Sequence, residues 1–520
     1  MAQIQFKGKQ FVQNHHLSVE YHELIPDKKK SLTDTVSLKD NLIIHGDNLK
    51  ALKALLPTYA GQVKCIYIDP PYNTGNENWA YNDNVNSPMM QEWLGKAVDK
   101  DDLTKHDKWL CMMLPRLKLL RELLTEDGII FASIDDIEVH HLRALMDEVF
   151  GEDCFLATFA RRTKIGGGSA AAAFAVEHDY VLAYCRDKDS LDPLFIPHDP
   201  EYLKRYAEED KDGSFFWDTM ERSSTATKPY KITAPDGTIL TGKWFRNEKR
   251  FLDDLKTGEV KIMKLKDGSW TVQFKQRMGN GRKLRSLMYE NDYKSSQEEV
   301  EEFGISGFPY PKPLFLLKRL IQSATDKDSI ILDSFAGSGT TGHAVLSLNK
   351  EDGGNRHFIL VECEDYADKV TAERVRRVIK GIPKAANETL KKGLGGAFSY
   401  FELGNPIIPE NLLTGKNMPT YKELARYVFY TATGEEFNEK AVNEKRNFIG
   451  ETTKYEVYMF YKPDVEYLKK TALTLDMAKS LPATKKKRLI FAPAKFLDQE
   501  QLDTYNIHFS QLPFEIYRRI

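Results

Sequence analysis

The stretch Ser-Ile-Ile-Leu-Asp-Ser-Phe-Ala-Gly-Ser-Gly-Thr-Thr-Gly, residues 329–342, decides the fold of this chain of 520 residues. It starts as a short apolar strand and runs directly into a glycine-rich turn and a helix. The glycine spacing matches the dinucleotide fingerprint, which allows a tight turn, close approach of a ligand and close helix packing. The next strand, residues 357–361, ends at Glu362, where an acid is expected to hold ribose hydroxyls. This order predicts a nucleoside-binding α/β unit; a turn used only for packing is the alternative.

A second motif, Asp69-Pro70-Pro71-Tyr72, lies upstream and closes an apolar run, Val63–Ile68, that is predicted to be a buried strand. Ligands of open α/β sheets bind at this end of the strands. Asp69 and the Pro70 carbonyl can accept hydrogen bonds from an exocyclic amine, and Tyr72 can stack on the ring that carries it. The motif therefore indicates a pocket for a flat amino heterocycle. A strand that ends in an ordinary proline turn is the alternative.

The glycine-rich turn limits the choice of nucleoside. A Walker-type loop is excluded because no lysine follows its glycines. A nicotinamide dehydrogenase is one alternative, but the tetrapeptide at residues 69–72 has no evident role in such an enzyme. S-adenosylmethionine fits better, since it lacks phosphates and needs a glycine-rich turn for its methionine part and an acid for its ribose. We therefore predict that the chain binds this sulfonium cofactor.

Strands and helices alternate around both motifs, which predicts an α/β fold with a doubly wound, mostly parallel sheet. The catalytic half spans residues 41–185 and the cofactor half residues 305–395, after a polar lead-in of residues 1–40. Residues 73–108 are expected to form a long functional loop. The expected strands of the catalytic half cover residues 42–45, 63–68, 129–134 and 180–184, and its expected helices cover residues 49–56, 109–124 and 139–150.

Residues 396–520 are predicted to form a separate, small C-terminal α/β domain. Strands are expected at residues 455–461 and 488–491, with a helix at residues 465–479 between them. This domain carries no chemical motif, and we therefore expect it to serve dimer or partner contacts.

The segment between the two halves is basic. Residues 228–294 hold 16 Lys and Arg against 8 Asp and Glu, a net of +8, in a chain whose formal net charge is −2. Aromatic residues lie among the basic ones, which favours phosphate neutralisation and base readout on a duplex. We therefore predict a target-recognition insert at residues 186–304; a solvated, β-rich insertion is the alternative. The candidate DNA contacts are Arg161, Arg162, Lys164, Lys243, Arg246, Arg282, Lys283 and Arg285.

The overall composition is that of a globular protein in a reducing compartment. Five cysteines are scattered along the chain without a CxxC pair, so neither a disulfide framework nor a zinc ribbon is supported. We expect no metal site. No signal-peptide pattern and no membrane-spanning run is recognisable, and the predicted location is the cytoplasm.

In combination and in order, these motifs resemble the amino-methylating DNA methyltransferases of the permuted β class, in which the catalytic motif precedes the cofactor motif. The resemblance is closer still to the modification (Mod) subunit of Type III restriction-modification systems, and it covers roughly residues 40–185 and 305–380. The stretches that carry it are Ile44–Leu49, Ile66–Gly75, Leu124–Gly128, Ser133–Asp136, Glu177–Tyr180, Tyr310–Pro313 and Phe335–Gly339.

This resemblance implies a circularly permuted, S-adenosylmethionine-dependent methyltransferase fold that methylates the N6 amine of an adenine flipped out of duplex DNA. Asp69, rather than Ser at this position, favours adenine over cytosine. A homodimer is also implied, with an ATP-dependent restriction subunit as partner. Two alternatives are a DNA-recognition subunit of a phage-defence complex in which methylation is secondary, and a methyltransferase that acts on RNA or protein.

The expected site residues fall into two groups. Asp69, Pro70, Pro71 and Tyr72 would be catalytic. Asp47 would contact the adenine of the cofactor unless it only caps the helix that follows it, and an exposed Lys312 without a ligand is the alternative to a cofactor contact. The predicted cofactor-binding residues are Asp47, Lys312, Asp333, Phe335, Gly337, Gly339, Thr340 and Glu362.

Overall fold

The computed structural model separates the chain into two compact units, Leu194–Leu284 and the remainder, Met1–Pro193 with Arg285–Ile520. The smaller unit lies within the segment that the basic composition marks as an insert. No helix among the described residues is long and apolar enough to span a membrane. The structure describes residues 3–74, 105–163, 174–222, 229–288, 305, 308, 311–385, 387–407, 412, 414–415, 418–435 and 437–512.

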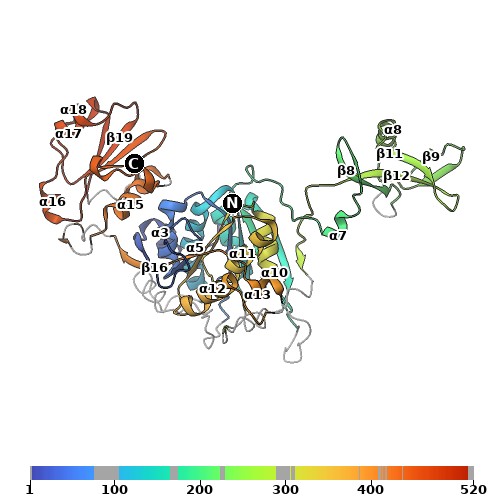
Figure 1. Ribbon diagram of the computed structural model, residues 1–520, viewed down its shortest axis with the longest axis horizontal. Helices are drawn as coiled ribbons and strands as arrows, with labels where there is room; N and C mark the ends of the chain where they lie inside the picture. The colour runs from blue at the N-terminus through green and yellow to red at the C-terminus, as the bar shows by residue number, and fades with distance from the viewer. Residues whose placement is uncertain are drawn as a thin grey trace. The chain divides into compact units, whose positions relative to one another are not determined.

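The larger unit contains β16 and the helices α3, α5, α10, α11 and α12 that are labelled in Figure 1. It is built on a ten-stranded sheet with the order β1-β16-β2-β15-β14-β3-β4-β6-β5-β13. The six strands from β16 to β4 are parallel to one another, whereas β1, β6 and β5 have antiparallel neighbours. The mostly parallel sheet expected from the sequence is therefore confirmed. The strands are β1 His22–Pro26, β2 Leu42–His45, β3 Val63–Ile68, β4 Leu124–Ile134, β5 Phe155–Arg162, β6 His178–Cys185, β13 Leu287–Met288, β14 Ile330–Asp333, β15 His357–Glu362 and β16 Ser399–Pro406.

Helices cover both faces of this sheet because its central strands are apolar on both sides. Along β15, Ile359 and Val361 join the core beneath α3, α5 and α6. Leu360 points to the opposite face, where it packs against Gly342 of α11 beside Val375 of α12. The helices of the first face are α3 Asn48–Tyr59, α5 Lys105–Leu123 and α6 Val139–Phe150, and those of the second are α10 Leu314–Ala324, α11 Thr340–Asp352 and α12 Glu373–Lys380.

The order of strands places the two sequence motifs side by side. Strand β14 lies between β15 and β3, and it pairs with β3 in parallel through Ile331 and Leu332 opposite Cys65 and Ile66. Strand β3, which carries the predicted catalytic motif, comes earlier in the chain than β14, which carries the predicted cofactor motif, as the permuted order requires. Since the strands are parallel, their carboxyl ends meet at one edge of the sheet, where α/β proteins bind ligands.

The smaller unit is β-rich. Its antiparallel sheet has the order β11-β12-β8-β7, a hairpin of β9 and β10 accompanies it, and its core gathers Met220, Trp244, Phe251 and Phe274. The elements are α7 Pro200–Leu203, β7 Glu208–Asp210, β8 Gly213–Thr219, β9 Tyr230–Thr233, β10 Ile239–Gly242, α8 Glu248–Thr257, β11 Val260–Lys264 and β12 Trp270–Arg277.

The C-terminal segment contains a sheet of its own, with the order β17-β18-β19-β20. The single helix expected at residues 465–479 is wrong: two short helices form there, because the Thr474 side chain accepts a hydrogen bond from the Met477 amide and starts a new helix. Strand β16, which also lies beyond residue 396, belongs to the main sheet. The elements are α15 Tyr421–Thr433, β17 Phe448–Glu451, β18 Tyr455–Met459, α16 Val465–Lys470, α17 Leu475–Ser480, β19 Lys487–Ala492, α18 Gln499–Thr504 and β20 Ile507–Gln511.

Candidate active site at the carboxyl edge of the sheet

Four neighbouring strands each end at an acidic residue on the same edge of the main sheet. Asp47 follows β2, Asp69 follows β3, Asp333 ends β14 and Glu362 ends β15. Each acid was predicted from its place at the end of an apolar run. The parallel pairing of these strands brings the four acids to one edge, and this edge is the candidate active site.

The predicted catalytic tetrapeptide carries a compact polar cluster. The Tyr72 hydroxyl donates a hydrogen bond to Asp69 Oδ1 at 3.0 Å. Lys312 Nζ donates to both Asp69 carboxylate oxygens at 2.6 and 2.7 Å, and to the Tyr72 hydroxyl oxygen at 2.7 Å. Its ammonium also lies 4.8 Å from the centre of the Tyr72 ring. Lys312, predicted as a cofactor contact, therefore lies on the carboxylate of Asp69, the predicted catalytic residue.

Buried hydrogen bonds hold the tetrapeptide and the strand that precedes it. The Trp109 indole donates to the Pro71 carbonyl at 2.7 Å, and the Tyr67 hydroxyl shares a hydrogen bond of 2.8 Å with Ser133. Burial raises the pKa of Tyr72 well above its ordinary value, with the Asp69 carboxylate as a further cause. Tyr72 thus stays a neutral ring with a hydroxyl donor, which suits stacking against a base.

The glycine turn after β14 has the backbone that the sequence predicts. Gly337 and Gly339 have φ angles of 51° and 78°, in the left-handed region that favours glycine. A Cβ atom at Gly337 would lie 3.2 Å from Phe308, and one at Gly339 would lie 2.9 Å from the Thr371 carbonyl oxygen. Both glycines are buried, and a side chain at either position would meet neighbouring protein atoms, so the turn requires glycine for its backbone conformation and its close packing.

The two acids beside this turn are deeply buried. Gly337 N donates to Glu362 Oε2 at 2.7 Å, and Phe335 N donates to Asp333 Oδ1 at 3.0 Å. Desolvation raises the pKa of Asp333 and the pKa of Glu362 to about 7 each. A cationic amine or a pair of ribose hydroxyls would complete these carboxylates, so both residues fit the predicted cofactor.

Two further cofactor candidates, Phe335 and Thr340, belong to the glycine turn and to the first residue of the helix after it. Arg374, fully buried beneath the turn, donates to Thr340 Oγ1 at 2.7 Å and to Ser338 Oγ at 3.0 Å. Phe335 packs against the core of the first face. Thr340 is thus held at the start of α11, and Phe335 is held in the turn that precedes this helix.

Of the two roles expected for Asp47, the structure shows the capping of α3, and the contact with the adenine of the cofactor stays a prediction. The Asp47 side chain accepts from the Lys50 amide at 3.1 Å and so caps α3. Arg116 Nη2 lies 3.3 Å from the second carboxylate oxygen, and Arg116 Nε donates to Asn48 at 2.5 Å. The sequence analysis missed Arg116, although an arginine inside the apolar run of α5 was a signal for a buried polar contact.

Some of the candidate DNA contacts are buried and others are exposed. Arg161 is 6% exposed and forms a bidentate pair with Asp179, while Arg246 is 8% exposed and pairs with Asp254. Both arginines are therefore placed for internal ion pairs rather than for a phosphate backbone. Lys164 lies outside the described residues. Lys243, Arg282, Lys283 and Arg285 are exposed, and Arg162 is half-buried.

A doubly wound, mostly parallel sheet with Asp69-Pro70-Pro71-Tyr72 and the glycine turn at one edge is the arrangement expected for an S-adenosylmethionine-dependent methyltransferase. The chain belongs to the N6/N4 DNA methylase family, which matches residues 63–373. The family inferred from the sequence motifs is thereby confirmed, as is the cofactor.

Among curated relatives, the Type III StyLTI Mod subunit of Salmonella typhimurium is 31% identical over 437 residues, covering 78% of this chain and 66% of the relative. The EcoPI Mod subunit of Escherichia phage P1 is 30% identical, covering 71% of this chain and 67% of the relative. The chain thus spans about two thirds of the length of these relatives. The solved M1.HpyAVI–SAM complex is 15% identical, covering 64% of this chain and 98% of that chain, with a TM-score of 0.33.

Proposed function

We propose that this protein transfers a methyl group from S-adenosylmethionine to the N6 amine of adenine at a specific site in duplex DNA. The observation that carries the proposal is the parallel pairing of β3 with β14. It places the acceptor carboxylate of Asp69 at the same edge of the sheet as the glycine turn and the acids of the cofactor site. The methyl donor and the amine would therefore meet between adjacent strand ends.

The residues of the tetrapeptide would activate and hold the base. The lone pair of an adenine amine is delocalised into its ring, so hydrogen bonds from the amine to Asp69 and the Pro70 carbonyl favour a more tetrahedral nitrogen. Tyr72 stacks on the base, which must leave the duplex to reach the pocket. Bound S-adenosylmethionine would supply the electrophilic methyl group. Most of the rate gain then comes from orientation and fixed polar groups.

Asp69 supports adenine over cytosine as the target. The family includes both N6-adenine and N4-cytosine enzymes, and the resemblance to Type III modification subunits favours the adenine branch. Two such subunits are proteins that this chain is similar to along most of its length. We therefore include in the proposal the role of a Type III modification and recognition subunit in the cytoplasm, acting as a homodimer with an ATP-dependent restriction subunit.

The basic insert would read the DNA. Its excess of Lys and Arg supports phosphate contacts, and the exposed Lys243, Arg282 and Lys283 are available in the structure for such contacts. The unit that carries them is a small β-rich body with its own core, which can present such side chains from a rigid frame.

The test is methyl transfer from labelled S-adenosylmethionine to duplex DNA. Asp69→Ala should lower the single-turnover rate about 10²–10³-fold, and Tyr72→Ala should weaken base stacking by roughly 1–3 kcal/mol. Asp326→Ala, an exposed acid at the amino end of β14, is the matched control and should keep the wild-type rate. A folded Asp69→Ala protein with full activity would refute the proposal. Duplex binding by the wild type without methyl transfer would favour a recognition subunit instead.

A further inference from the structure

A second polar cluster lies beside the catalytic tetrapeptide, and no role has been assigned to it so far. Glu138 follows the carboxyl end of β4 and caps α6, where its carbonyl accepts from the Leu142 amide at 2.8 Å. Its side chain is 0% exposed. A carboxylate buried to this degree is stable only when hydrogen bonds or opposite charges replace water.

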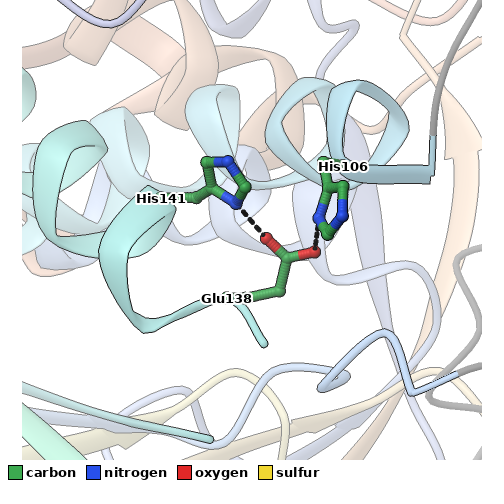
Figure 2. A group of neighbouring side chains, drawn as sticks. All are labelled: His106, Glu138 and His141. Atoms are coloured by element: carbon green, nitrogen blue, oxygen red, sulfur yellow. Dashed lines mark hydrogen bonds and ion pairs between the residues drawn. The ribbon is translucent and has the colours of Figure 1, made fainter. Parts of the chain in front are cut away.

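Three donors from three different segments satisfy this carboxylate. His106 Nδ1 of α5 lies 2.7 Å from Glu138 Oε1, and His141 Nδ1 of α6 lies 2.8 Å from Oε2 (Figure 2). Asn73 Nδ2 donates to Oε1 at 2.6 Å. The two imidazoles therefore fix the orientation of Glu138, and Glu138 in turn fixes the Asn73 amide.

Asn73 connects this cluster to the chemistry because it directly follows Tyr72. It is 2% exposed, and its φ of 60° lies in the left-handed region, which asparagine tolerates but does not prefer. Its amide also donates to the Lys105 carbonyl at 3.2 Å, and Lys105 Nζ donates back to the Asn73 carbonyl at 3.3 Å. The backbone that aims Tyr72 and Asp69 is thus held in a less favoured conformation by side-chain bonds.

We propose that Glu138 is a positioning residue for the catalytic tetrapeptide, acting through Asn73 and clamped by His106 and His141. The inference rests on the proposed function for its effect on rate. Without the carboxylate, the Asn73 amide loses its buried acceptor and the left-handed turn loses the bond that stabilises it. Asp69 and Tyr72 then sample directions in which they cannot hold the base.

The ligand atoms of His106, Glu138 and His141 lie within 4.8 Å of one another, a spacing that would allow a metal ion. The geometry favours hydrogen bonds. Each imidazole meets a different carboxylate oxygen at 2.7 or 2.8 Å, whereas tetrahedral zinc with bonds of about 2.0–2.1 Å keeps its ligand atoms about 3.3 Å apart. The carboxylate also has a third donor, Asn73.

The rate experiment compares Glu138→Ala with Asp147→Ala. Asp147 lies on the same helix and accepts from Arg143 and the Tyr184 hydroxyl, so its variant removes a similar network away from the tetrapeptide. Glu138→Ala, which leaves no acceptor for the Asn73 amide, should slow single-turnover methyl transfer by about 10²-fold with an affinity for S-adenosylmethionine within about twofold of wild type. The Asp147→Ala protein should keep the wild-type rate. Because Glu138 and Asn73 act through the bond between them, Asn73→Ala combined with Glu138→Ala should be no slower than the slower single variant.

Hydrogen exchange tests the inference without relying on activity. The amides of Tyr72, Asn73 and Thr74 should exchange faster in Glu138→Ala than in wild type, and they should exchange at the wild-type rate in Asp147→Ala. Equal exchange and an equal methyl-transfer rate in Glu138→Ala would overturn the inference, as would one equivalent of zinc in the wild-type protein that is lost in His106→Gln. A wild-type protein that methylates no DNA refutes the proposed function alone, and the exchange result then decides the positioning role.

Discussion

Lys312 shows how far single residues could be predicted from the sequence. The sequence places it between two prolines before the cofactor strand, and it was assigned to the cofactor. The structure brings its ammonium onto Asp69 and Tyr72. Asp69, Glu362 and the glycines were predictable because each sits at a strand end that a local pattern reveals. The partners of Lys312 come from a distant part of the chain, as do Asn73 and His106 at Glu138, and only the tertiary fold joins them.

Replacing Lys312 distinguishes a role in orienting Asp69 from a role in binding the cofactor. In Lys312→Met the Asp69 carboxylate loses its ion pair, and its orientation loosens, so the methyl-transfer rate should fall about tenfold to hundredfold. The affinity for S-adenosylmethionine, measured by calorimetry, should stay within about threefold. Lys318→Met on α10, which removes a surface pair with Glu351, is the control. A large loss of cofactor affinity with an unchanged rate would restore the cofactor role.

The acids Asp333 and Glu362 predict that cofactor binding depends on pH. Burial raises the pKa of each carboxyl to about 7, so below this pH the free protein holds them protonated. A cationic methionine amine near Asp333 and ribose hydroxyls at Glu362 favour the ionised forms. Binding should therefore release protons and weaken as the pH falls from 8 to 6, by up to about tenfold per pH unit for each group. Calorimetry in two buffers of different ionisation enthalpy measures this release, and affinity independent of pH would contradict it.

At the scale of elements, the strands and helices near the motifs were predicted well, whereas the outer strands of the main sheet were not predicted. The expected strands at residues 42–45 and 63–68 and the helix at residues 139–150 agree with β2, β3 and α6. Strands β1, β5, β13 and β16 were missed, because β13 has only two residues and the other three are only partly buried, so no apolar run marks them in the sequence. The four acids at the candidate site could be placed at one edge of the sheet because they follow its central, apolar strands.

The glycine turn offers a test at this scale. Gly339→Ala forces an L-residue to a φ of 78° and brings its Cβ to 2.9 Å from a backbone oxygen, whereas Gly353 has a similar φ of 69° with open space around it. Both variants should lose about 1–2 kcal/mol of unfolding free energy from the left-handed backbone. Only Gly339→Ala should also lose cofactor affinity, by about tenfold or more, because the turn must move. Denaturant unfolding and calorimetry measure the two effects, and equal cofactor affinity in both variants would argue against a cofactor role for the turn.

At the scale of the whole molecule, we expect the larger unit to carry out methyl transfer and the smaller unit, Leu194–Leu284, to recognise the DNA site. Ile196 and Arg282 exchange two backbone hydrogen bonds of 2.9 Å, so the two ends of this unit lie side by side. Residues 197–281 can therefore be replaced by a short glycine-serine link. The shortened protein should bind S-adenosylmethionine within about twofold of wild type and lose site-selective DNA binding.

Salt dependence supplies the control for this deletion. In the full chain, the logarithm of DNA affinity should fall linearly with the logarithm of salt concentration, by about 0.9 for each phosphate neutralised. The shortened protein should lose most of this slope. DNA binding that is insensitive to salt in the full chain, or unchanged after deletion, would show that recognition lies elsewhere.

The most direct test of the central claim is the identity of the methylated nucleoside. Duplex DNA is incubated with the full chain and methyl-labelled S-adenosylmethionine, digested to nucleosides and analysed by mass spectrometry. Our account predicts label on N6-methyladenine, absent when Asp69→Ala replaces the wild type. Label on N4-methylcytosine, or on adenine in the Asp69→Ala reaction at the wild-type level, would contradict it.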